Sequence, residues 1–337
     1  MKYTALGVDI FAGGFTIGVK KHFKVLGHLE HGPYGVKTSR LNLPDVPVHV
    51  GKENWPGFNR LQADFVYANP PCAIWSGASA RRGPTWKDDP RTNCIHDVMA
   101  QLGREPRVLV WESVCNAWTR GQELLRRLAD ETMEKGWAVT HCLHDGQHLG
   151  LPHRRRRYFF VAHKVELKWP TAFQAPVTVR QALKGVDPGT MRPDPPKSFL
   201  VLYKRARAGN MFRHYITTAE QNKKGFSRPG FFTKKLPLDE PAYTIMHPQT
   251  FHPTEPRYLT IDEFKAVCNY PPGFKLDGGD IQQLFRAVMP STGAWIAGIA
   301  KDGIRRNRNT PVQENFVDLR DLDNIVIKPA FRERVSI

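Results

Sequence analysis

Five short apolar runs in the first 165 residues constrain the fold of this chain more than any other feature. Each run has the length of a buried strand, and the first leads directly into a glycine-rich turn. Amphipathic patterns typical of helices lie between some of them, at residues 94–102 and 121–134. Such alternation predicts an α/β fold with a doubly wound, Rossmann-like parallel sheet, whose ligands bind outside the carboxyl ends of the strands. The five runs span residues 5–11, 23–30, 63–68, 107–112 and 158–162.

The composition of the chain changes after residue 168, where prolines cluster, basic residues accumulate and the regular hydrophobic periodicity ends. A chain of 337 residues is long enough for one large and one small domain. Further on, Thr260 with Glu263 at the capping-box position predicts the start of a helix. We expect a catalytic domain over residues 1–165, a smaller, loop-rich domain over 166–250, helices over 251–303 that complete the first domain, and a tail over 304–337.

The net charge is the strongest bulk signal of the chain. Forty-nine Lys and Arg residues against 32 Asp and Glu give a formal net charge of +17, which predicts a polyanionic partner. The segment from Phe199 to Lys235 holds nine of these basic residues and a single acidic one, Glu220. Aromatic residues such as Tyr203 and Phe212 lie between the basic ones. This interleaving is more typical of a nucleic-acid surface than of an ordinary solvated face.

The cysteine content indicates a reducing compartment. Five cysteines are spread through the chain without any C-x-x-C pair, which argues against a disulfide scaffold or a zinc ribbon. No metal site is therefore expected. No apolar stretch is long enough to cross a bilayer, and the N-terminus lacks a signal-peptide pattern, so we expect a cytoplasmic protein without membrane association.

One cysteine, Cys72, stands directly behind two prolines at the end of the third apolar run. Pro70 and Pro71 stiffen the turn that carries its thiol. Two interpretations are open on these residues alone: a small buried side chain fills the turn, or a nucleophile is held in a fixed position. Other strand ends carry carboxylates, because Glu30 ends the second run and Glu112 ends the fourth. Surface carboxylates are common, so neither is decisive on its own.

Four segments, taken in order and spacing, resemble motifs of the C5-cytosine DNA methyltransferase family of bacteria and phages. They are residues 9–13 (DIFAG, its cofactor motif), 70–76 (PPCAIWS, its Pro-Cys nucleophile loop), 112–114 (ESV, its Glu-Asn-Val motif) and 153–157 (HRRRR, its Gln-x-Arg-x-Arg motif). The resemblance runs from Leu6 to about Ala300 and favours the nucleophile interpretation of Cys72. Further similar stretches lie at residues 87–91, 175–183, 241–245 and 257–263.

The resemblance implies a methyltransferase domain that uses S-adenosylmethionine, a smaller target-recognition domain, and methylation of cytosine C5 in DNA. In the implied chemistry, Cys72 adds to C6 of a flipped-out cytosine, and C5 then takes a methyl group. Glu112 would donate a proton at N3, and Arg157, supported by Arg155, would hold the base at O2. The implied cofactor-binding residues are Asp9, Phe11 (at the adenine), Gly13, Gly14, Glu30 (at the ribose), Lys52, Glu53 and Pro71.

Double-stranded DNA is the implied partner, and RNA stays open because basic and aromatic surfaces suit both backbones. A monomeric, stand-alone bacterial or phage enzyme is expected, with a cognate restriction nuclease as a further candidate partner. Candidate base-reading residues are Arg205, Arg207, Asn210, Arg213, Gln221 and Asn222. The candidate DNA-binding residues are Ser76, Arg81, Arg82, Lys204, Arg205, Arg207, Arg213, Lys223 and Lys224.

Several positions depart from the family pattern, mostly around the cofactor. The glycine turn at residues 11–15 (FAGGF) is shorter, and the acid that meets the adenine in the family is replaced by Lys52 or Glu53. A cationic Lys52 would suit a donor with extra negative charge, so a carboxylated S-adenosylmethionine is an alternative donor. A DNA-binding homologue without catalysis is a second alternative. Other departures are Ala73, Ser113, His153, Met289 and Pro290.

Overall fold

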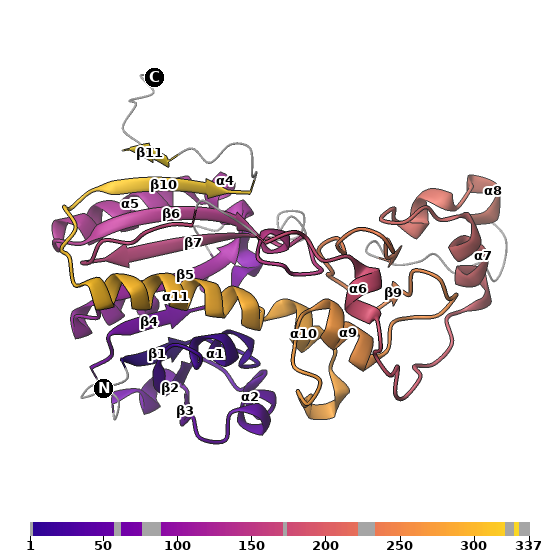
Figure 1. Cartoon of the computed structure of the whole chain (residues 1–337), viewed down its shortest axis with the longest axis horizontal. Coiled ribbons are helices and arrows are strands. Elements are labelled where there is room, and N and C mark those ends of the chain that lie inside the picture. Colours follow the sequence, from indigo (N-terminus) through magenta and orange to yellow (C-terminus); the bar gives the residue numbers. More distant parts are fainter. Residues whose placement is uncertain are drawn as a thin grey trace. The chain divides into compact units, whose positions relative to one another are not determined.

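The computed structural model describes residues 3–56, 62–75, 89–170, 174–221, 233–320 and 327–329. The chain divides into two compact units, which are described one at a time below (Figure 1). The first unit comprises Met1–Asp145, Arg156–Phe173 and Pro290–Ile337. The second unit comprises Gly146–Arg155 and Gln174–Met289. Within the described ranges, no helix combines the length and apolar character that a bilayer-spanning segment requires.

The first unit is built on a nine-stranded sheet with the order β11-β10-β6-β7-β5-β4-β1-β2-β3. Its strands are β1 (Thr4–Val8), β2 (Lys24–Glu30), β3 (Val48–Val50), β4 (Phe65–Ala68), β5 (Val108–Val114), β6 (Ala138–Asp145), β7 (Arg156–His163), β10 (Glu314–Leu319) and β11 (Ile327–Pro329). From β3 to β5 all neighbours are parallel. Their carboxyl ends therefore share one edge of the sheet, where a doubly wound fold binds its ligands.

The five apolar runs are confirmed as β1, β2, β4, β5 and β7, but the sheet is not wholly parallel. β7 runs antiparallel to both of its neighbours, β5 and β6. A parallel neighbour requires a crossover connection, whereas the chain returns from β6 to β7 directly through residues 146–155. The predicted tail also contributes to the sheet, because β10 pairs in parallel with β6.

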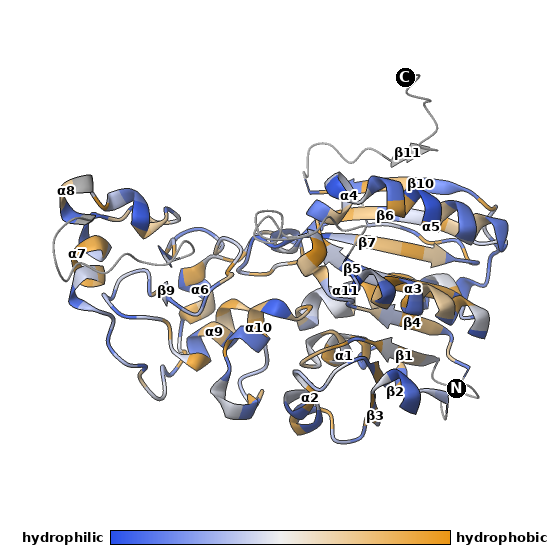
Figure 2. Cartoon of the chain, turned by 180° about the vertical axis from the view of Figure 1, so that it is seen from behind, coloured by the Kyte–Doolittle hydropathy of each residue, from blue (hydrophilic) through white to orange (hydrophobic). Residues whose placement is uncertain are grey.

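Helices of the first unit cover the sheet and fix its strand ends. They are α1 (Gly14–Val19), α2 (Val36–Asn42), α3 (Thr92–Ala100), α4 (Asn116–Arg120), α5 (Gln122–Glu134) and α11 (Pro290–Arg306). α5 buries Leu124, Leu125 and Leu128 on one side and is otherwise largely hydrophilic (Figure 2). α1 and α11 cross in close contact at Gly18, where a Cβ atom would lie 2.2 Å from the carbonyl oxygen of Pro290. Only glycine permits this approach.

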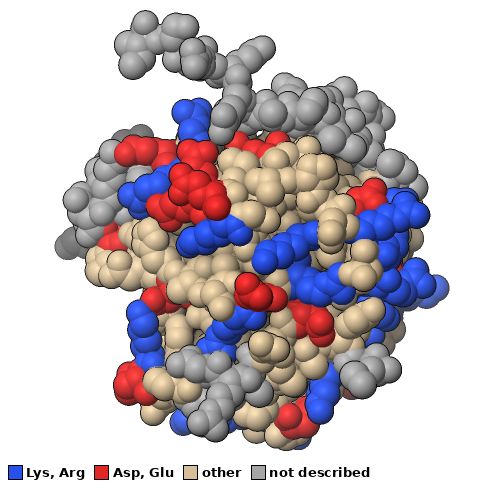
Figure 3. Space-filling view, turned by 90° about the vertical axis from the view of Figure 1, so that its left-hand side faces the viewer, with Lys and Arg blue, Asp and Glu red and all other residues tan. Residues whose placement is uncertain are grey.

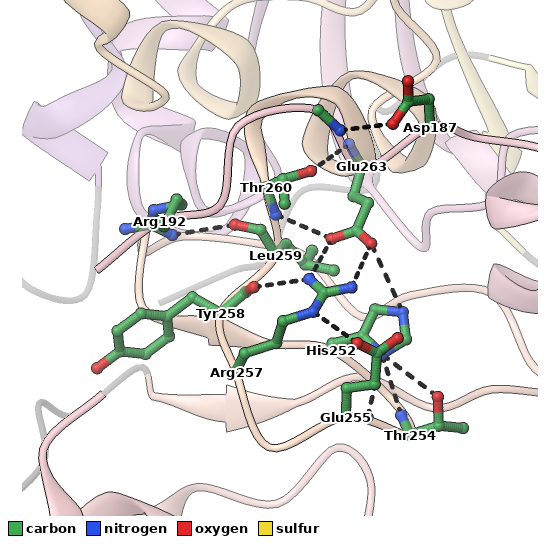
Figure 4. A network of polar contacts seen from close by, with 11 residues as sticks. Asp187, Arg192, His252, Thr254, Glu255, Arg257, Tyr258, Leu259, Thr260 and Glu263 are labelled. Atoms are coloured by element: carbon green, nitrogen blue, oxygen red, sulfur yellow. Dashed lines mark hydrogen bonds and ion pairs between the residues drawn. The ribbon is translucent and has the colours of Figure 1, made fainter. Parts of the chain in front are cut away.

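The second unit is smaller and rich in loops. Its elements are α6 (Val179–Leu183), α7 (Lys197–Arg205), α8 (Thr218–Gln221), β8 (Lys234–Lys235), β9 (Thr250–Phe251), α9 (Ile261–Val267) and α10 (Gln282–Arg286). The sequence grouped α9 and α10 with the first domain, and the structure corrects this, because α9 packs against α6. Thr260 caps α9 and forms the predicted capping box with Glu263. The Glu263 carboxylate also accepts hydrogen bonds from both terminal nitrogens of Arg257, at 2.8 and 2.7 Å (Figure 4).

Short 3-10 turns complete the description of the chain. They are η1 (Lys52–Asn54), η3 (Cys72–Trp75) and η6 (Gln101–Arg104) in the first unit, and η7 (Gly146–His148), η8 (Phe212–Tyr215) and η9 (Asp277–Gly279) in the second. Two of these turns, η1 and η3, follow sheet strands of the first unit. They carry residues that the sequence assigned to the cofactor and to the nucleophile.

Candidate active site

A buried carboxylate lies near the carboxyl end of β5. Glu112 is 2% exposed. Its Oε1 lies 2.8 Å from Nε of Arg157, and its Oε2 accepts a 2.6 Å hydrogen bond from Nδ2 of Asn69. Arg157, on β7, pairs with Val114 of β5. It is therefore the diagonal neighbour of Glu112 on the same face of the sheet. The guanidinium and the amide together offset the cost of burying the carboxylate.

The loop that carries Cys72 follows β4, the strand next to β5. Cys72 begins η3, and the turn is anchored by the buried Trp75. Trp75 packs so closely on Gly121 that a Cβ atom there would lie 2.8 Å from the indole ring. The half-buried thiol of Cys72 lies within electrostatic range of the Arg91 guanidinium. A nearby cation favours the thiolate, which is the nucleophilic form of cysteine.

Sheet register brings the Cys72 loop and Glu112 to one edge. β4 and β5 are parallel neighbours, and Ala68 pairs with Trp111 at the end of their ladder. Asn69 and Glu112 are the next residues on the two strands, and their side chains are hydrogen-bonded to each other. Because Cys72 follows Asn69 by three residues, the thiol and the carboxyl group belong to the same end of the sheet.

The four consecutive arginines of residues 154–157 each have a different partner. Arg157 alone of the four pairs with Glu112. The sequence predicted that Arg155 and Arg157 would point together, and burial does alternate along the run: Arg155 and Arg157 are buried, whereas Arg154 and Arg156 are exposed. β7 itself begins at Arg156. Arg155 is buried in the second unit and donates to backbone carbonyls of Phe285 and Ala287 at 2.7 and 2.9 Å. The outer two arginines pair with Glu240 (from Arg154) and Asp145 (from Arg156).

The turn after β1 has the conformation expected of a ligand-binding loop. Asp9, Phe11 and Gly13 all have positive φ, at 53°, 66° and 87°. Such backbone costs non-glycine residues about 1–3 kcal/mol each and is concentrated at functional sites. Glu30, 4% exposed at the end of β2, accepts hydrogen bonds from the backbone N–H groups of Ile10 and Phe11 at 2.8 and 3.3 Å. Burial and the Asp9 carboxylate raise the pKa of Glu30 well above its usual value.

A chain of ionic contacts that the sequence did not predict begins at the same turn. The ring of His31 lies between two carboxylates, with Nδ1 2.8 Å from Asp9 and Nε2 3.0 Å from Asp97. Burial alone would lower the pKa of His31, but hydrogen bonds to Asp9, Cys94 and Asp97 raise it to about 11. His31 is therefore a cation at neutral pH. Ligand atoms of Asp9, His31 and Cys94 all lie within 4.8 Å of one another.

The two candidates for the adenine-facing position have different surroundings. Lys52 Nζ lies 2.5 Å from Oδ1 of Asp97, so Lys52 is linked through Asp97 and His31 to the turn after β1. Glu53 instead accepts a hydrogen bond from Nδ2 of the adjacent Asn54 at 3.2 Å. Of the other predicted cofactor residues, Gly14 begins α1 and Pro71 is half-buried in the loop before Cys72. The ring of Phe11 lies 4.9 Å from that of the half-exposed Tyr34, centroid to centroid, at a tilt of 51°.

Three aromatic residues of the basic segment lie in a core, which corrects their prediction as a nucleic-acid surface, while Phe226, Phe231 and Phe232 lie outside the described residues. Phe199, Tyr203 and Phe212 are at most 7% exposed and pack with Phe251 and Tyr258. A small unit needs these rings to build an interior. The basic side chains remain outside: Lys204, Arg205 and Arg207 are exposed and Arg213 is half-buried.

One of these basic side chains is engaged within its own unit. Nη1 of Arg205 lies 2.7 Å from Oε1 of Glu220. Hydrogen bonds from Thr217 and Arg205 lower the pKa of Glu220 to about 2. On the face drawn in Figure 3, Lys and Arg are densest toward the right-hand side of the view, and Asp and Glu are scattered among them. Ser76, Arg81, Arg82, Asn222, Lys223 and Lys224 lie outside the described residues.

Comparison with known proteins identifies the family. A family model described as C-5 cytosine-specific DNA methylase matches residues 7–223. The chain belongs to this family. Among curated relatives, the Type II methyltransferase M1.HphI of Haemophilus parahaemolyticus is 28% identical over 169 residues, which is 47% of this chain and 45% of that protein. A tRNA (cytosine(38)-C(5))-methyltransferase of Bos taurus is 32% identical over 146 residues, 42% of this chain and 34% of that protein. The chain thus spans less than half the length of these two relatives.

The fold of the family is also found among solved structures. A putative DNA modification methyltransferase encoded within a prophage, from Escherichia coli, has a TM-score of 0.65 at 18% identity. The alignment covers 90% of this chain and 99% of that one. At this identity the likeness concerns the fold, which agrees with the predicted Rossmann-like α/β architecture.

Sequence reasoning missed three residues that the structure brings to the strand ends: Asn69, His31 and Asp97. Asn69 precedes the two prolines of the Cys72 loop, and His31 directly follows the acid that ends β2. Their closeness to the predicted motifs was a usable signal. Asp97 lies in the middle of α3 and gave none, because only the fold brings that helix to the turn after β1.

Proposed function

We propose that this protein is a DNA cytosine-C5 methyltransferase. The observation that carries the proposal is the buried Glu112, held by Arg157 and Asn69 beside the loop of Cys72. A soluble fold has little reason to bury a carboxylate at a strand end unless a ligand uses it, since its desolvation costs several kcal/mol in typical proteins. Glu112 is far from Cys72 in the sequence, but the register of β4 and β5 brings it to the Cys72 loop. This arrangement suits a reaction that needs both groups.

The proposed reaction begins with the Cys72 thiolate, which forms a bond to C6 of the target cytosine. The electrons of the C5–C6 double bond move to C4–C5, and those of the C4–N3 double bond move to N3. Glu112, protonated from solvent as the base binds, donates this proton to N3, so that the ring becomes an enamine. Arg157 fixes the orientation of Glu112 and its cation balances the carboxylate that the proton leaves behind. S-adenosylmethionine, when bound, supplies an electrophilic methyl group to C5. The C5 proton then leaves to solvent, its bonding electrons re-form the C5–C6 double bond as the C6–S bond breaks, and Cys72 is again a thiolate. N3 returns its proton to Glu112, which leaves neutral 5-methylcytosine.

The turn after β1 fits S-adenosylmethionine. The Glu30 carboxylate has about four acceptor sites, of which the N–H groups of Ile10 and Phe11 use two. Two remain for a pair of ribose hydroxyls. The Phe11 ring and the half-exposed Tyr34 offer apolar surface for a purine. We therefore assign Asp9, Phe11, Gly13, Gly14 and Glu30 to the cofactor, with Pro71 beside the donor.

We propose the unmodified donor rather than a carboxylated one. Lys52 was the reason to consider extra negative charge, but its ammonium group is 2.5 Å from the Asp97 carboxylate. His31 and Lys52 carry two positive charges, and Asp9 and Asp97 carry two negative ones, so the cluster is balanced without a further anion. The intact Cys72 and Glu112 likewise support catalysis over a purely DNA-binding role.

Nucleoside mass spectrometry tests the proposal directly. Plasmid DNA and transfer RNA are incubated separately with the protein and S-adenosylmethionine, beside Cys72→Ala and Glu112→Gln. We expect one methyl group on deoxycytidine, absent with Cys72→Ala. Methylation of transfer RNA alone would refute DNA as the substrate. A product heavier than methylcytosine, made with a donor that copurifies, would refute the unmodified donor, and no product on either nucleic acid would refute the activity.

A further inference from the structure

Asn69 connects three strand ends of the first unit. It follows β4, and its backbone N–H donates to the carbonyl oxygen of Val8 on β1, 3.2 Å away. Its side chain reaches across to β5, where Nδ2 donates to Oε2 of Glu112 at 2.6 Å. The same residue begins the two-proline loop that ends at Cys72. A change at Asn69 therefore acts on the loop and on the carboxyl group together.

Arg157 holds only one oxygen of Glu112. Its Nε lies 2.8 Å from Oε1, while its Nη1 donates to the backbone carbonyl of Arg156 at 2.7 Å. A guanidinium commonly binds a carboxylate through two parallel hydrogen bonds, which would turn both oxygens toward it. Because Asn69 takes the second oxygen, Glu112 keeps Oε2 on the side of the Cys72 loop.

We propose that Asn69 is a positioning residue for methyl transfer, which holds Oε2 of Glu112 toward the target base and so sets the rate of the Cys72 addition. This inference rests on the proposed cytosine-C5 activity. A neutral amide suits the task, because it orients the carboxyl group without adding a charge that would compete with Arg157. Release of Nδ2 when the base arrives frees Oε2 to reach N3, and Arg157 keeps the group in place through Oε1.

The test is a single-turnover measurement with a covalent trap. DNA is synthesised enzymatically with 5-fluorodeoxycytidine triphosphate, so that every recognition site carries the trap whatever its sequence. After Cys72 adds to C6 and C5 takes the methyl group, fluorine stands where the leaving proton would be, and the C6–S bond persists. The rate of adduct formation is measured with S-adenosylmethionine for wild type, Asn69→Ala and Asn69→Asp. DNA affinity and thermal unfolding are measured in parallel.

Asn42 provides a matched control. It is also half-buried, and its Nδ2 donates at 2.8 Å to the carbonyl oxygen of Thr38, within α2. Asn42→Ala removes a comparable hydrogen bond that does not involve Glu112. We expect this variant to form the adduct within twofold of the wild-type rate.

We expect Asn69→Ala to slow adduct formation about 10- to 100-fold, the usual range for losing a hydrogen bond to a charged group, with DNA affinity within threefold of wild type. Asn69→Asp keeps the size of the side chain but repels Glu112, so it should be slower than Asn69→Ala. A role in filling space alone predicts the opposite order, and that order would overturn the inference. An unchanged rate for Asn69→Ala would also overturn it. Wild-type protein that forms no adduct would overturn the proposed function and this inference with it.

Discussion

Arg157→Met is the change that most directly tests the geometry of the Glu112 site. The side chains of Arg157 and Glu112 are 11% and 3% exposed, so solvent screens their interaction little. Methionine is unbranched like the stem of arginine and fills part of the same space without the charge. The substitution removes the counter-charge of Glu112 and leaves its hydrogen bond from Asn69.

The expected loss follows from the burial of the pair. Removing one partner of a buried ion pair typically costs about 3–5 kcal/mol, because the other charge stays desolvated. The double variant Glu112→Gln, Arg157→Met buries no charge at this position, and most of the loss should then be recovered. Both variants should be inactive in methyl transfer, so stability and activity separate in the double variant.

Equilibrium unfolding in urea, followed by the fluorescence of the eight tryptophans, measures these free energies. Arg154→Met is the control, because its pair with Glu240 is exposed at 48% and 61% and should contribute no more than about 1 kcal/mol. A loss below about 1 kcal/mol for Arg157→Met would place that pair in the same class and refute its burial. A double variant no more stable than Arg157→Met would refute the electrostatic origin of the loss.

Further predictions concern contacts within each unit and the ionic chain. Gly18→Ala should cost about 1–3 kcal/mol or more in thermal unfolding, because the added Cβ would lie 2.2 Å from the Pro290 carbonyl oxygen. Protonated His31 stabilises the fold fully below about pH 6.5, and this contribution is lost as the pH rises through about 11. His31→Gln should therefore flatten the fall in unfolding free energy over that range. Glu263→Gln should increase amide exchange in the second unit by weakening its bonds to Arg257.

Strands that are apolar along their length could be predicted from the sequence, and strands that depend on their neighbours could not. β4 and the start of β5 are continuous apolar runs and were found. β6 reads AVTHCLHD, which has no clear period, although all of its residues are buried. It is a strand because β7 and β10 pair with it on either side. β10 itself was hidden in a tail of mixed charge.

The same distinction holds for the site. Cys72 and Glu112 were predicted because each stands in a local motif at a strand end. The contact of Asn69 with Glu112 spans 43 residues and depends on the register of two strands, which a motif does not encode. The aromatic residues of α7 were assigned to a surface because they alternate with lysine and arginine. This alternation also fits an amphipathic helix. Its apolar face, with Phe199 and Leu202, is buried.

The arginine run at residues 154–157 shows how neighbouring residues of one motif acquire different partners. The chain leaves the second unit after Arg155 and enters the first at Arg156. Before this point the backbone is bonded elsewhere, since the N–H of Arg154 donates to the carbonyl oxygen of Ala242 at 2.7 Å. Burial nevertheless alternates through the whole run, since Arg155 and Arg157 are buried and Arg154 and Arg156 are exposed. The spacing of the arginines therefore predicts which two are buried, and the start of β7 separates their partners: Arg155 donates to carbonyl oxygens of the second unit, and Arg157 pairs with Glu112.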